Sequence, residues 1–426
     1  MPASILATPV SPDSAPHAAA IPHRHGADRL RAEQAARAIL RQLPAAARPA
    51  PSSEQWAQLG AGLLRGDAPA DALASWLQST DSKVGWALIG QALERGIDSL
   101  EEAPAPLKAF FDLVEARPAW VQDELLTEGA RVCALGGLAG MRTLLVTGLL
   151  VGYQLSAVNQ TLLATGALEK GAARRIAETT KWWADVTTEG AMQRFASGFK
   201  STVRVRLIHA LVRQQVGQQA SWDAAELGVP VCQTDMQATY LAFSVVYLLG
   251  MQLIGVRLSC AEREAVMHLW RYIAWVNGVD EGFLHGLVEG ESSGLGLLYR
   301  NLLSQRMADQ DSARLAQALV AEPLGRNYRR WSWLQGRYNR SLQLSIARAC
   351  MNNASLRSLG LPVCYLPWYP LLLIPFNRLL HGLARRVPGG RDWLIRRGRA
   401  QQANYLAVLF GARPPELRDI AAVKLA

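Results

Sequence analysis

The sequence predicts an all-α protein folded as a single large helical domain, and three observations favour this class. Apolar residues recur at spacings of three and four residues through most of the chain, which is typical of helices with one buried face. Half of the 426 residues are apolar and only 19% are charged, so the chain can bury a large core. Helical proteins of this length can share one core, although average domain size also allows two or three domains.

The first part of the chain divides into a leader and a helical segment. Residues 1–27 are rich in alanine, proline and serine, and we expect a mobile leader there. Residues 28–105 show helical spacing of tryptophan and leucine between breaks near Pro51 and Pro69. Neither part contains a catalytic motif. The Ala-Pro-Ala-Pro sequence at 103–106 marks a turn before the next helices.

Three apolar runs follow, and they allow two interpretations. Residues 132–158 carry one charge, Arg142, and are long enough to span a membrane. The run at 240–256 is shorter, and the run at 361–376 holds four prolines that would break a simple spanning helix. A mean hydropathy of +0.04 is low for a protein that crosses a membrane several times. We therefore predict buried core helices, whose glycines would let a flat cofactor or another helix approach closely.

A helix is predicted from about residue 171 to 187, and Arg175 and Thr179 stand one turn apart on it. Their side chains share a face with Trp182 or Trp183, so a guanidinium and a hydroxyl point into one place. Such a pair could polarise dioxygen in a haem pocket, with tryptophan excluding solvent. The alternative is an ordinary helix surface, with a solvated arginine and a threonine bonded to its own turn.

The next helix, from about residue 191 to 215, carries the strongest candidate for a cofactor ligand. Arg206, His209 and Arg213 share one face because they are three or four residues apart. Two nearby cations favour the neutral imidazole, which is the form that binds a metal. The arginines could also bind carboxylates such as the two propionates of haem. A surface helix with solvated arginines is the alternative interpretation. The rival histidines, which lack arginine flanks, are His268, His285 and His381.

The net charge of +10 comes almost entirely from arginine, which suits contacts with anions better than lysine does. No nucleic-acid-binding motif accompanies it, and the arginines gather at 326–340 and 378–399, where they could contact lipid headgroups or be solvated. Five scattered cysteines fit neither a disulfide framework nor a zinc site, which indicates a reducing compartment. Because the N-terminus shows no export signal, we expect a cytoplasmic protein, with at most a peripheral membrane contact.

Residues spread over about 110–300 resemble one helical family in both order and spacing. This family comprises the latex-clearing rubber oxygenases and the related fungal endoplasmic-reticulum oxygenase of the mycophenolic acid pathway. The residues that carry the resemblance are Thr165 to Leu168, Arg174, Arg175, Thr179, Arg206 to Arg213, Gly228 to Pro230, Gln233, Asp235, Phe243, Ser244, Trp270, Arg271 and Gly278.

The resemblance implies a b-type haem enclosed by helices that pack in a globin-like way. Residues 106–300 would form the haem-binding oxygenase core, and 301–426 a C-terminal helical segment packed on it. The resemblance assigns His209 as the proximal iron ligand and puts Arg175 and Thr179 on the distal side. Arg206 and Arg213 would support the haem and its helix, and dioxygen would be the co-substrate.

The resemblance also implies the reaction, which is oxidative cleavage of a carbon–carbon double bond in an isoprenoid or other apolar substrate. No particular electron donor is indicated. Some members of the family place a lysine beside the distal threonine and a carboxylate on the preceding helix. This chain has Glu178 before Thr179, Lys181 displaced along the helix, and Asn159 with Gln160 on the earlier helix.

Because of these departures, a distal base is not predicted, and three other functions stay open. The chain could oxygenate another apolar metabolite, since a changed distal base can redirect the chemistry. It could carry or sense haem without turnover. It could also be a haem-free, membrane-associated helical scaffold, which the apolar runs at 132–158 and 240–256 would suit.

Overall fold

The computed structural model describes residues 20–40, 50–166, 172–284 and 291–411, and these residues form an all-α fold as predicted. Across the described residues the β-structure amounts to one isolated bridge, between Leu155 and Met307. The expected leader lies outside these ranges as far as residue 19. The prediction of a mobile leader is wrong for residues 20–27, which pack on the core. The buried Arg24 donates to both carboxylate oxygens of Asp235, at 2.8 and 3.1 Å.

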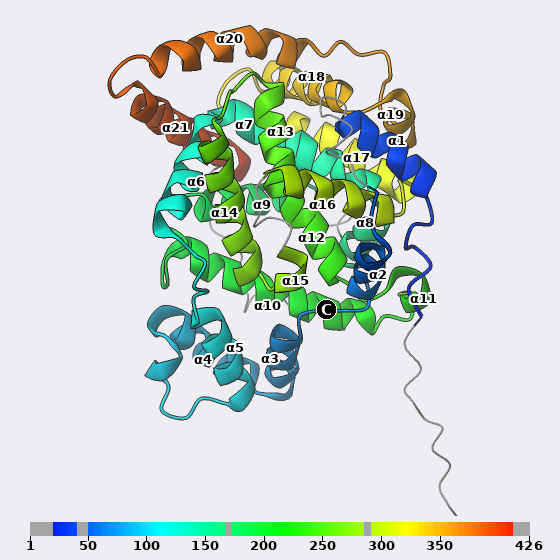
Figure 1. Cartoon of the computed structure of the whole chain (residues 1–426), viewed down its shortest axis with the longest axis vertical. Helices are drawn as coiled ribbons and strands as arrows, with labels where there is room; N and C mark the ends of the chain where they lie inside the picture. Colours follow the sequence, from blue (N-terminus) through cyan, green and yellow to red (C-terminus); the bar gives the residue numbers. More distant parts are fainter. Residues whose placement is uncertain (1–19, 41–49, 167–171, 285–290, 412–426) are drawn as a thin grey trace, which may run out of the picture.

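The N-terminal helices separate into two groups rather than one segment. Helices α1 and α2 lie against the main body, whereas α3, α4 and α5 form a small bundle beneath α10 (Figure 1). Three of these helices have capped starts: Ser52 and Gln55 form a capping box on α2, and Asp67 and Asp81 cap α3 and α4. The bounds are α1 Arg29–Ile39, α2 Ser53–Gly62, α3 Ala68–Ser79, α4 Ser82–Arg95, η2 Ile97–Ser99 and α5 Ala105–Glu115.

The apolar run at 132–158 does not form one long helix. It turns sharply at Gly136, and the two halves of the path, Asp123–Leu135 and Gly137–Gln154, differ in direction by 92°. A π-helical turn, η3, follows within the second half; such turns often occur at functional sites. The bounds are α6 Asp123–Leu135, α7 Gly137–Leu144, η3 Leu145–Leu150, η4 Gly152–Gln154 and α8 Ser156–Ala164.

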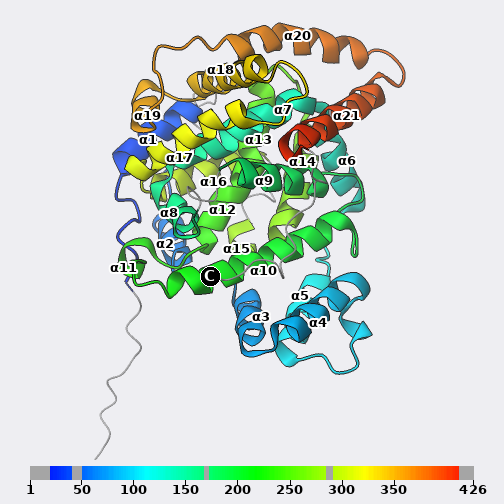
Figure 2. The ribbon, with the colours of Figure 1, turned by 180° about the vertical axis from the view of Figure 1, so that it is seen from behind.

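The central helices surround the candidate site. Helix α10 crosses the lower part of the body, and α9, α12 and α14 lie above it (Figure 2). The path Gln233–Leu253, which joins α12 to α13 at Ser244, is long and apolar enough to cross a membrane, but two thirds of its most apolar window is buried. The bounds are α9 Ala172–Val186, α10 Ser197–Gly217, α11 Ala224–Leu227, α12 Gln233–Phe243, α13 Val245–Leu253, α14 Cys260–Val276, α15 Glu281–Leu284 and α16 Glu291–Ser304.

The C-terminal helices cover the end of the body opposite the α3–α5 bundle (Figures 1 and 2). Helix α21 packs on α6 and α7, and α18 packs beneath α20, which lies across the top. The bounds are α17 Gln310–Ala321, η6 Glu322–Gly325, α18 Ser332–Cys350, α19 Asn353–Ser358, α20 Trp368–Ala384 and α21 Gly390–Phe410. Most of the buried apolar side chains form one large cluster, and a second cluster joins η3 to α17 and α18.

Candidate functional site

Helix α10 has one stripe that is neither buried nor fully exposed, and His209 lies on it. The other members of this half-buried stripe are Arg204, Val205, Ile208 and Val212, which recur at the spacing of one helical face. The opposite face of α10, including Leu207, Ala210 and Leu211, is buried in the large apolar cluster. The helix is therefore anchored along one side while the imidazole stays partly accessible on the other.

The imidazole of His209 is held in its neutral form. Burial is the main cause that lowers its pKa to about 4, the charge of Arg213 adds to this effect, and Asp67 opposes it. The predicted direction is correct, but Arg206 is not among the causes. In the described part of the chain, Nδ1 of His209 is buried and has no hydrogen-bond partner. A neutral imidazole with an unpartnered nitrogen is suited to binding a metal.

Arg206 is fully occupied by groups of the protein itself. Its Nε and Nη2 atoms donate to the two carboxylate oxygens of Asp67 at 2.7 and 2.9 Å, and Nη1 donates to the carbonyl of Val276 at 3.3 Å. Both side chains of this ion pair are buried. Gly278 makes the pairing possible: its φ is +88°, and a Cβ there would lie 2.0 Å from Asp67 and 2.7 Å from Arg206.

Arg213 pairs in the same way with the next carboxylate of α3. Its Nη1 bonds Asp71 and its Nη2 donates to the carbonyl of Val231 at 3.1 Å. The carboxylates of Asp67 and Asp71 pair with these arginines in this structure, although Nε of Arg213 is buried without a partner among the described residues. The expected contact of the two arginines with haem propionates stays a prediction. In this structure Arg206 and Arg213 join α10 to α3, and so hold the helix that carries His209.

Helix α9 approaches α10 at an aromatic contact. Trp182, buried as predicted, donates from Nε1 to the hydroxyl of Thr202 at 3.3 Å. Its ring contacts Phe243 and Trp270 edge-on, with centroids 5.6 and 5.9 Å apart. Figure 2 shows α9 and α10 close at this end and farther apart toward the start of α9. Arg175 and Thr179, both half-buried, lie on that diverging part of α9.

Tyr153 is a site residue that sequence reasoning missed. Its buried phenol lies beside the guanidinium of Arg175, and burial raises the pKa of the phenol although that charge opposes the shift. The carbonyl of Tyr153 accepts from Asn159 at 2.9 Å, and Asn159 also donates to Ser312 at 3.0 Å. Asn159, one of the two residues at the expected base position, thus serves to hold the turn that orients Arg175. No sequence motif marks Tyr153, because only the fold brings it to α9.

The two charged neighbours of Thr179 are also paired. Glu178 accepts from Arg174 at 2.9 Å, and Lys181 bonds both carboxylate oxygens of Asp185. These are pairs one turn apart on α9, the spacing at which helix side chains meet. Lys181 is therefore drawn toward the C-terminal end of α9 and away from Thr179.

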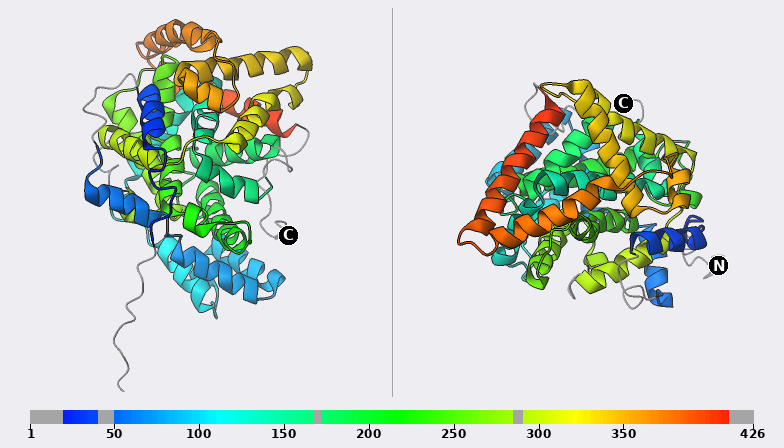
Figure 3. Two further views of the ribbon diagram at one scale, coloured as in Figure 1. Left: turned by 90° about the vertical axis from the view of Figure 1, so that its right-hand side faces the viewer. Right: turned by 90° about the horizontal axis from the view of Figure 1, so that it is seen from above.

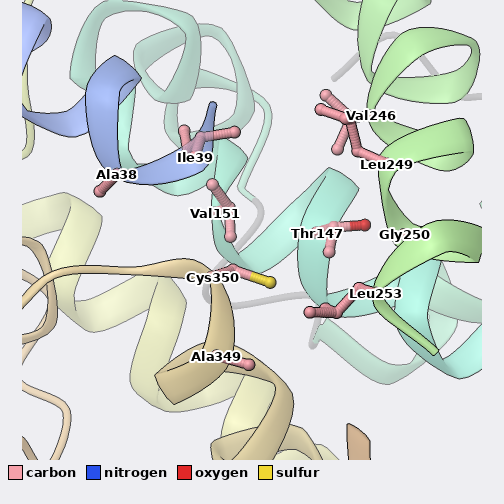
Figure 4. Close-up of a pocket in the computed structure, with 10 residues that line it drawn as sticks. All are labelled: Ala38, Ile39, Thr147, Val151, Val246, Leu249, Gly250, Leu253, Ala349 and Cys350. Atoms are coloured by element: carbon pink, nitrogen blue, oxygen red, sulfur yellow. The ribbon is translucent and has the colours of Figure 1, made fainter. Parts of the chain in front are cut away.

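An apolar cavity opens where η3 meets α13. Thr147 and Val151 line it on one side and Val246 and Leu249 on the other, with Cys350 at the end of α18 (Figure 4). A second cavity shares Thr147, Val151 and Val246 and continues along α12 and α16. Val151 lies two residues before Tyr153, so this apolar space runs beside the turn that holds Arg175. The buried run predicted at 132–158 supplies its wall.

The rival histidines have other surroundings. His268 accepts a hydrogen bond from the backbone N–H of Gln122 at 3.1 Å, which occupies its Nε2. His381 lies on the buried face of α20 near Arg385 and Glu262, and His285 lies outside the described residues. Among the described residues no three His, Cys, Asp or Glu side chains gather as a metal-binding group. Of the described histidines on helices, His209 is the one that combines partial access with a nitrogen that has no hydrogen-bond partner.

Comparison with known proteins agrees with this architecture. A solved structure titled "Structure of Latex Clearing Protein LCP in the closed state" superposes with a TM-score of 0.58, covering 80% of this chain and 91% of that one at 19% identity, which supports the same fold. The rubber oxygenase of Streptomyces sp. (strain K30) is 26% identical over 204 residues, 47% of this chain. That alignment spans about half (48%) of the relative's length.

The match to a protein family covers more of the chain than the match to this single relative. Residues 136–386 match the family described as "ER-bound oxygenase mpaB/B'/Rubber oxygenase, catalytic domain". This range contains α9, α10 and the cavity beside η3, and it extends beyond the expected core to the end of α20. The chain belongs to this family of oxygenases, as its sequence resemblance indicated.

Proposed function

We propose that the chain is a haem b-dependent oxygenase with His209 as the iron ligand. One observation carries this proposal: a neutral, half-buried imidazole with an unpartnered nitrogen stands on a helix fixed by two arginine–carboxylate pairs. Membership of an oxygenase family makes dioxygen the expected co-substrate. A single histidine ligand is a common mode of haem attachment, and it needs no cluster of metal-binding residues.

The residues present fit a haem in a specific way. His209 would hold the iron, while Arg206 and Arg213 would keep α10 in place through Asp67 and Asp71. When bound, haem b would supply the redox chemistry by which an oxygenase uses dioxygen. The apolar side chains of Val205 and Ile208, on the same half-buried stripe as His209, suit the flat face of a porphyrin.

On the other side of the proposed site the protein would contribute hydrogen bonds and orientation. Arg175 would direct its charge toward dioxygen, with its guanidinium beside the phenol of Tyr153. The hydroxyl of Thr179 would add a second polar contact on the same face of α9. Trp182, Phe243 and Trp270 would exclude water from the end where α9 and α10 meet.

We further propose an apolar olefin, such as an isoprenoid, as the substrate, because the cavity beside η3 is lined by aliphatic side chains. Addition of dioxygen across a carbon–carbon double bond breaks that bond and leaves one oxygen atom on each carbon. Both atoms of dioxygen then appear in two carbonyl products, so the overall reaction balances without an external reductant.

The test is product analysis with haem-loaded protein, isotopically heavy dioxygen and a panel of olefins that contains squalene, a carotenoid and an unsaturated fatty acid. We expect two carbonyl fragments from one substrate, each with one heavy oxygen atom. Arg175→Ala should lower the rate by about a hundredfold or more, the effect typical of removing a donor that stabilises developing charge. Arg174→Ala is the control, since Arg174 is exposed on the same helix and pairs with Glu178. Haem-loaded protein that cleaves none of the panel would contradict the proposed reaction.

A haem carrier or sensor is the second candidate, and one observation favours it. Asn159 is hydrogen-bonded on the earlier helix, and Lys181 is paired away from Thr179, so neither of these positions supplies a free distal base. The two functions separate in a stopped-flow experiment with reduced protein and dioxygen. A stable spectrum that is unaffected by any olefin would favour a carrier, whereas olefin-dependent decay would favour the oxygenase.

A further inference from the structure

Helix α20 exposes an unusual apolar stripe. Leu372, Phe376, Leu379 and Leu383 recur at intervals of four, three and four residues, so they lie on one face. Their exposed fractions are 65%, 54%, 63% and 54%. We call these four residues the α20 stripe. Four large exposed apolar side chains on one helix face form a larger apolar patch than the isolated exposed leucines common on soluble proteins.

The other face of α20 is attached to the protein. Asn377 donates to the carbonyl of Ile254 at 2.8 Å, and the backbone N–H of Tyr369 donates to Ser345 at 2.9 Å. Asn377, Tyr369 and His381 are all buried. The α20 stripe is therefore a stable outward face of a docked helix, and it lies across the outermost end of the molecule (Figure 3).

Aromatic side chains flank this end. Helix α18 packs against α20, with Tyr338 and Trp368 ring centroids 5.7 Å apart, and its start exposes Trp333 to 69%. Trp393, at the start of α21, is also exposed. Arg337 lies over the ring of Trp333 at 5.0 Å and Arg397 over Trp393 at 5.4 Å. Tryptophan with neighbouring arginine is typical of the level of lipid headgroups.

Charge is concentrated in the same region. Residues 326–411 contain fourteen arginines, no lysine and a single carboxylate, Asp392, so this segment supplies the whole positive net charge of the chain. Eight of these arginines are exposed and form no salt bridge with any carboxylate that the structure describes. They are Arg329, Arg330, Arg337, Arg340, Arg357, Arg378, Arg386 and Arg396.

We infer that the α20 stripe inserts into the surface of an anionic lipid bilayer, with Arg378 and Arg386 contacting lipid headgroups. An amphipathic surface needs both features, because one apolar face alone binds weakly and basic residues add attraction to anionic lipid. A second copy of the chain is a poorer occupant, since pairing two such faces would bring their unpaired arginines together. The proposal does not depend on haem or on the reaction.

The test is flotation of the full chain with vesicles of phosphatidylcholine alone and of phosphatidylcholine with phosphatidylglycerol. We expect binding to the anionic vesicles that weakens as sodium chloride is raised, because salt screens the arginines. Leu372→Asn with Leu379→Asn should weaken partitioning by about tenfold or more, as two leucine side chains no longer enter the apolar layer. Arg378→Gln with Arg386→Gln should weaken it by about fivefold per residue on anionic vesicles only.

Matched controls are available at the other end of the molecule, where α4 lies (Figure 1). Val84→Asn removes an equally exposed apolar side chain and Arg95→Gln an exposed arginine, and both variants should bind as the parent chain does. Failure of the parent chain to float with anionic vesicles would overturn the inference. The inference would also be overturned if the variant with Leu372→Asn and Leu379→Asn floated as the parent chain does and changed from dimer to monomer in analytical ultracentrifugation. That result would assign the stripe to contact with a second copy.

Discussion

His209 stays neutral between two arginines because burial dominates its electrostatics and Asp67 compensates Arg206. Burial lowers the pKa of the imidazole to about 4, with Arg213 as the second cause. The buried carboxylate of Asp67 takes both Nε and Nη2 of Arg206. At the scale of single residues, the candidate site therefore depends on charges paired within the protein, and the two arginines act on the proposed iron ligand through the position of α10.

Asp67→Ala tests this pairing. Removing the carboxylate leaves the guanidinium of Arg206 buried without its counter-charge, so the free energy of unfolding should fall by about 3–5 kcal/mol in urea titrations. Asp112→Ala is the comparison, because Asp112 pairs with Lys108 on an exposed surface of α5, and its loss should leave the free energy of unfolding nearly unchanged. Similar small losses for both variants would mean that Asp67 does not hold α10.

The buried His381 gives a pH dependence. Burial, Arg385 and Arg397 lower its pKa to about 4 while Glu262 opposes them, so the folded state releases a proton that the unfolded chain binds below pH 6.5. Stability should therefore fall as pH drops from 6.5 to about 4, with no further loss from this group below that range. His381→Gln should remove about 3 kcal/mol of that decline between these two pH values. An unchanged slope of unfolding free energy against pH would contradict the assignment.

At the scale of helices, the sequence pattern predicted the helices themselves better than the contacts between them. The helices expected at 171–187 and 191–215 appear as Ala172–Val186 and Ser197–Gly217, since apolar spacing is a local signal. The partners of Arg206 and Arg213 were missed because Asp67 and Asp71 lie 139 and 142 residues away in the chain. The contact of Tyr153 with Arg175 was missed for a similar reason, as it arises from the turn after η3.

A substitution at Gly278, just after α14, tests how closely the elements around α10 pack against one another. Gly278→Ala adds a Cβ 2.0 Å from an oxygen of Asp67 at a φ of +88°, so steric overlap adds to backbone strain. We expect a loss of about 3 kcal/mol or more in thermal or urea unfolding. Gly190→Ala has a similar φ of +73° with no neighbour within 4 Å, and should cost only about 1–2 kcal/mol. Equal losses would show that backbone conformation alone requires Gly278.

At the scale of the whole molecule, the candidate oxygenase site and the proposed membrane-binding surface lie in different parts of the fold. The candidate oxygenase site lies among α9, α10 and the central helices, whereas the arginine-rich C-terminal helices form one end of the body (Figures 2 and 3). The family match from residue 136 to 386 spans both regions. Apolar spacing predicted the all-α class, and the sequence itself shows the arginine clusters. The prediction that the run at 361–376 is buried is wrong for its helical part, because Leu371, Leu372 and Phe376 of α20 are exposed.

The most direct test of the central claim is the absorption spectrum of purified protein in oxidised and reduced forms, with a pyridine haemochrome assay. We expect a Soret band and haem b in the parent chain, and loss of both in His209→Ala. His381→Ala should keep the band, because His381 belongs to α20, which lies across the top of the body, whereas α10 crosses its lower part (Figure 1). Absence of haem after reconstitution, or a parental spectrum in His209→Ala, would contradict the assignment of His209 as the iron ligand.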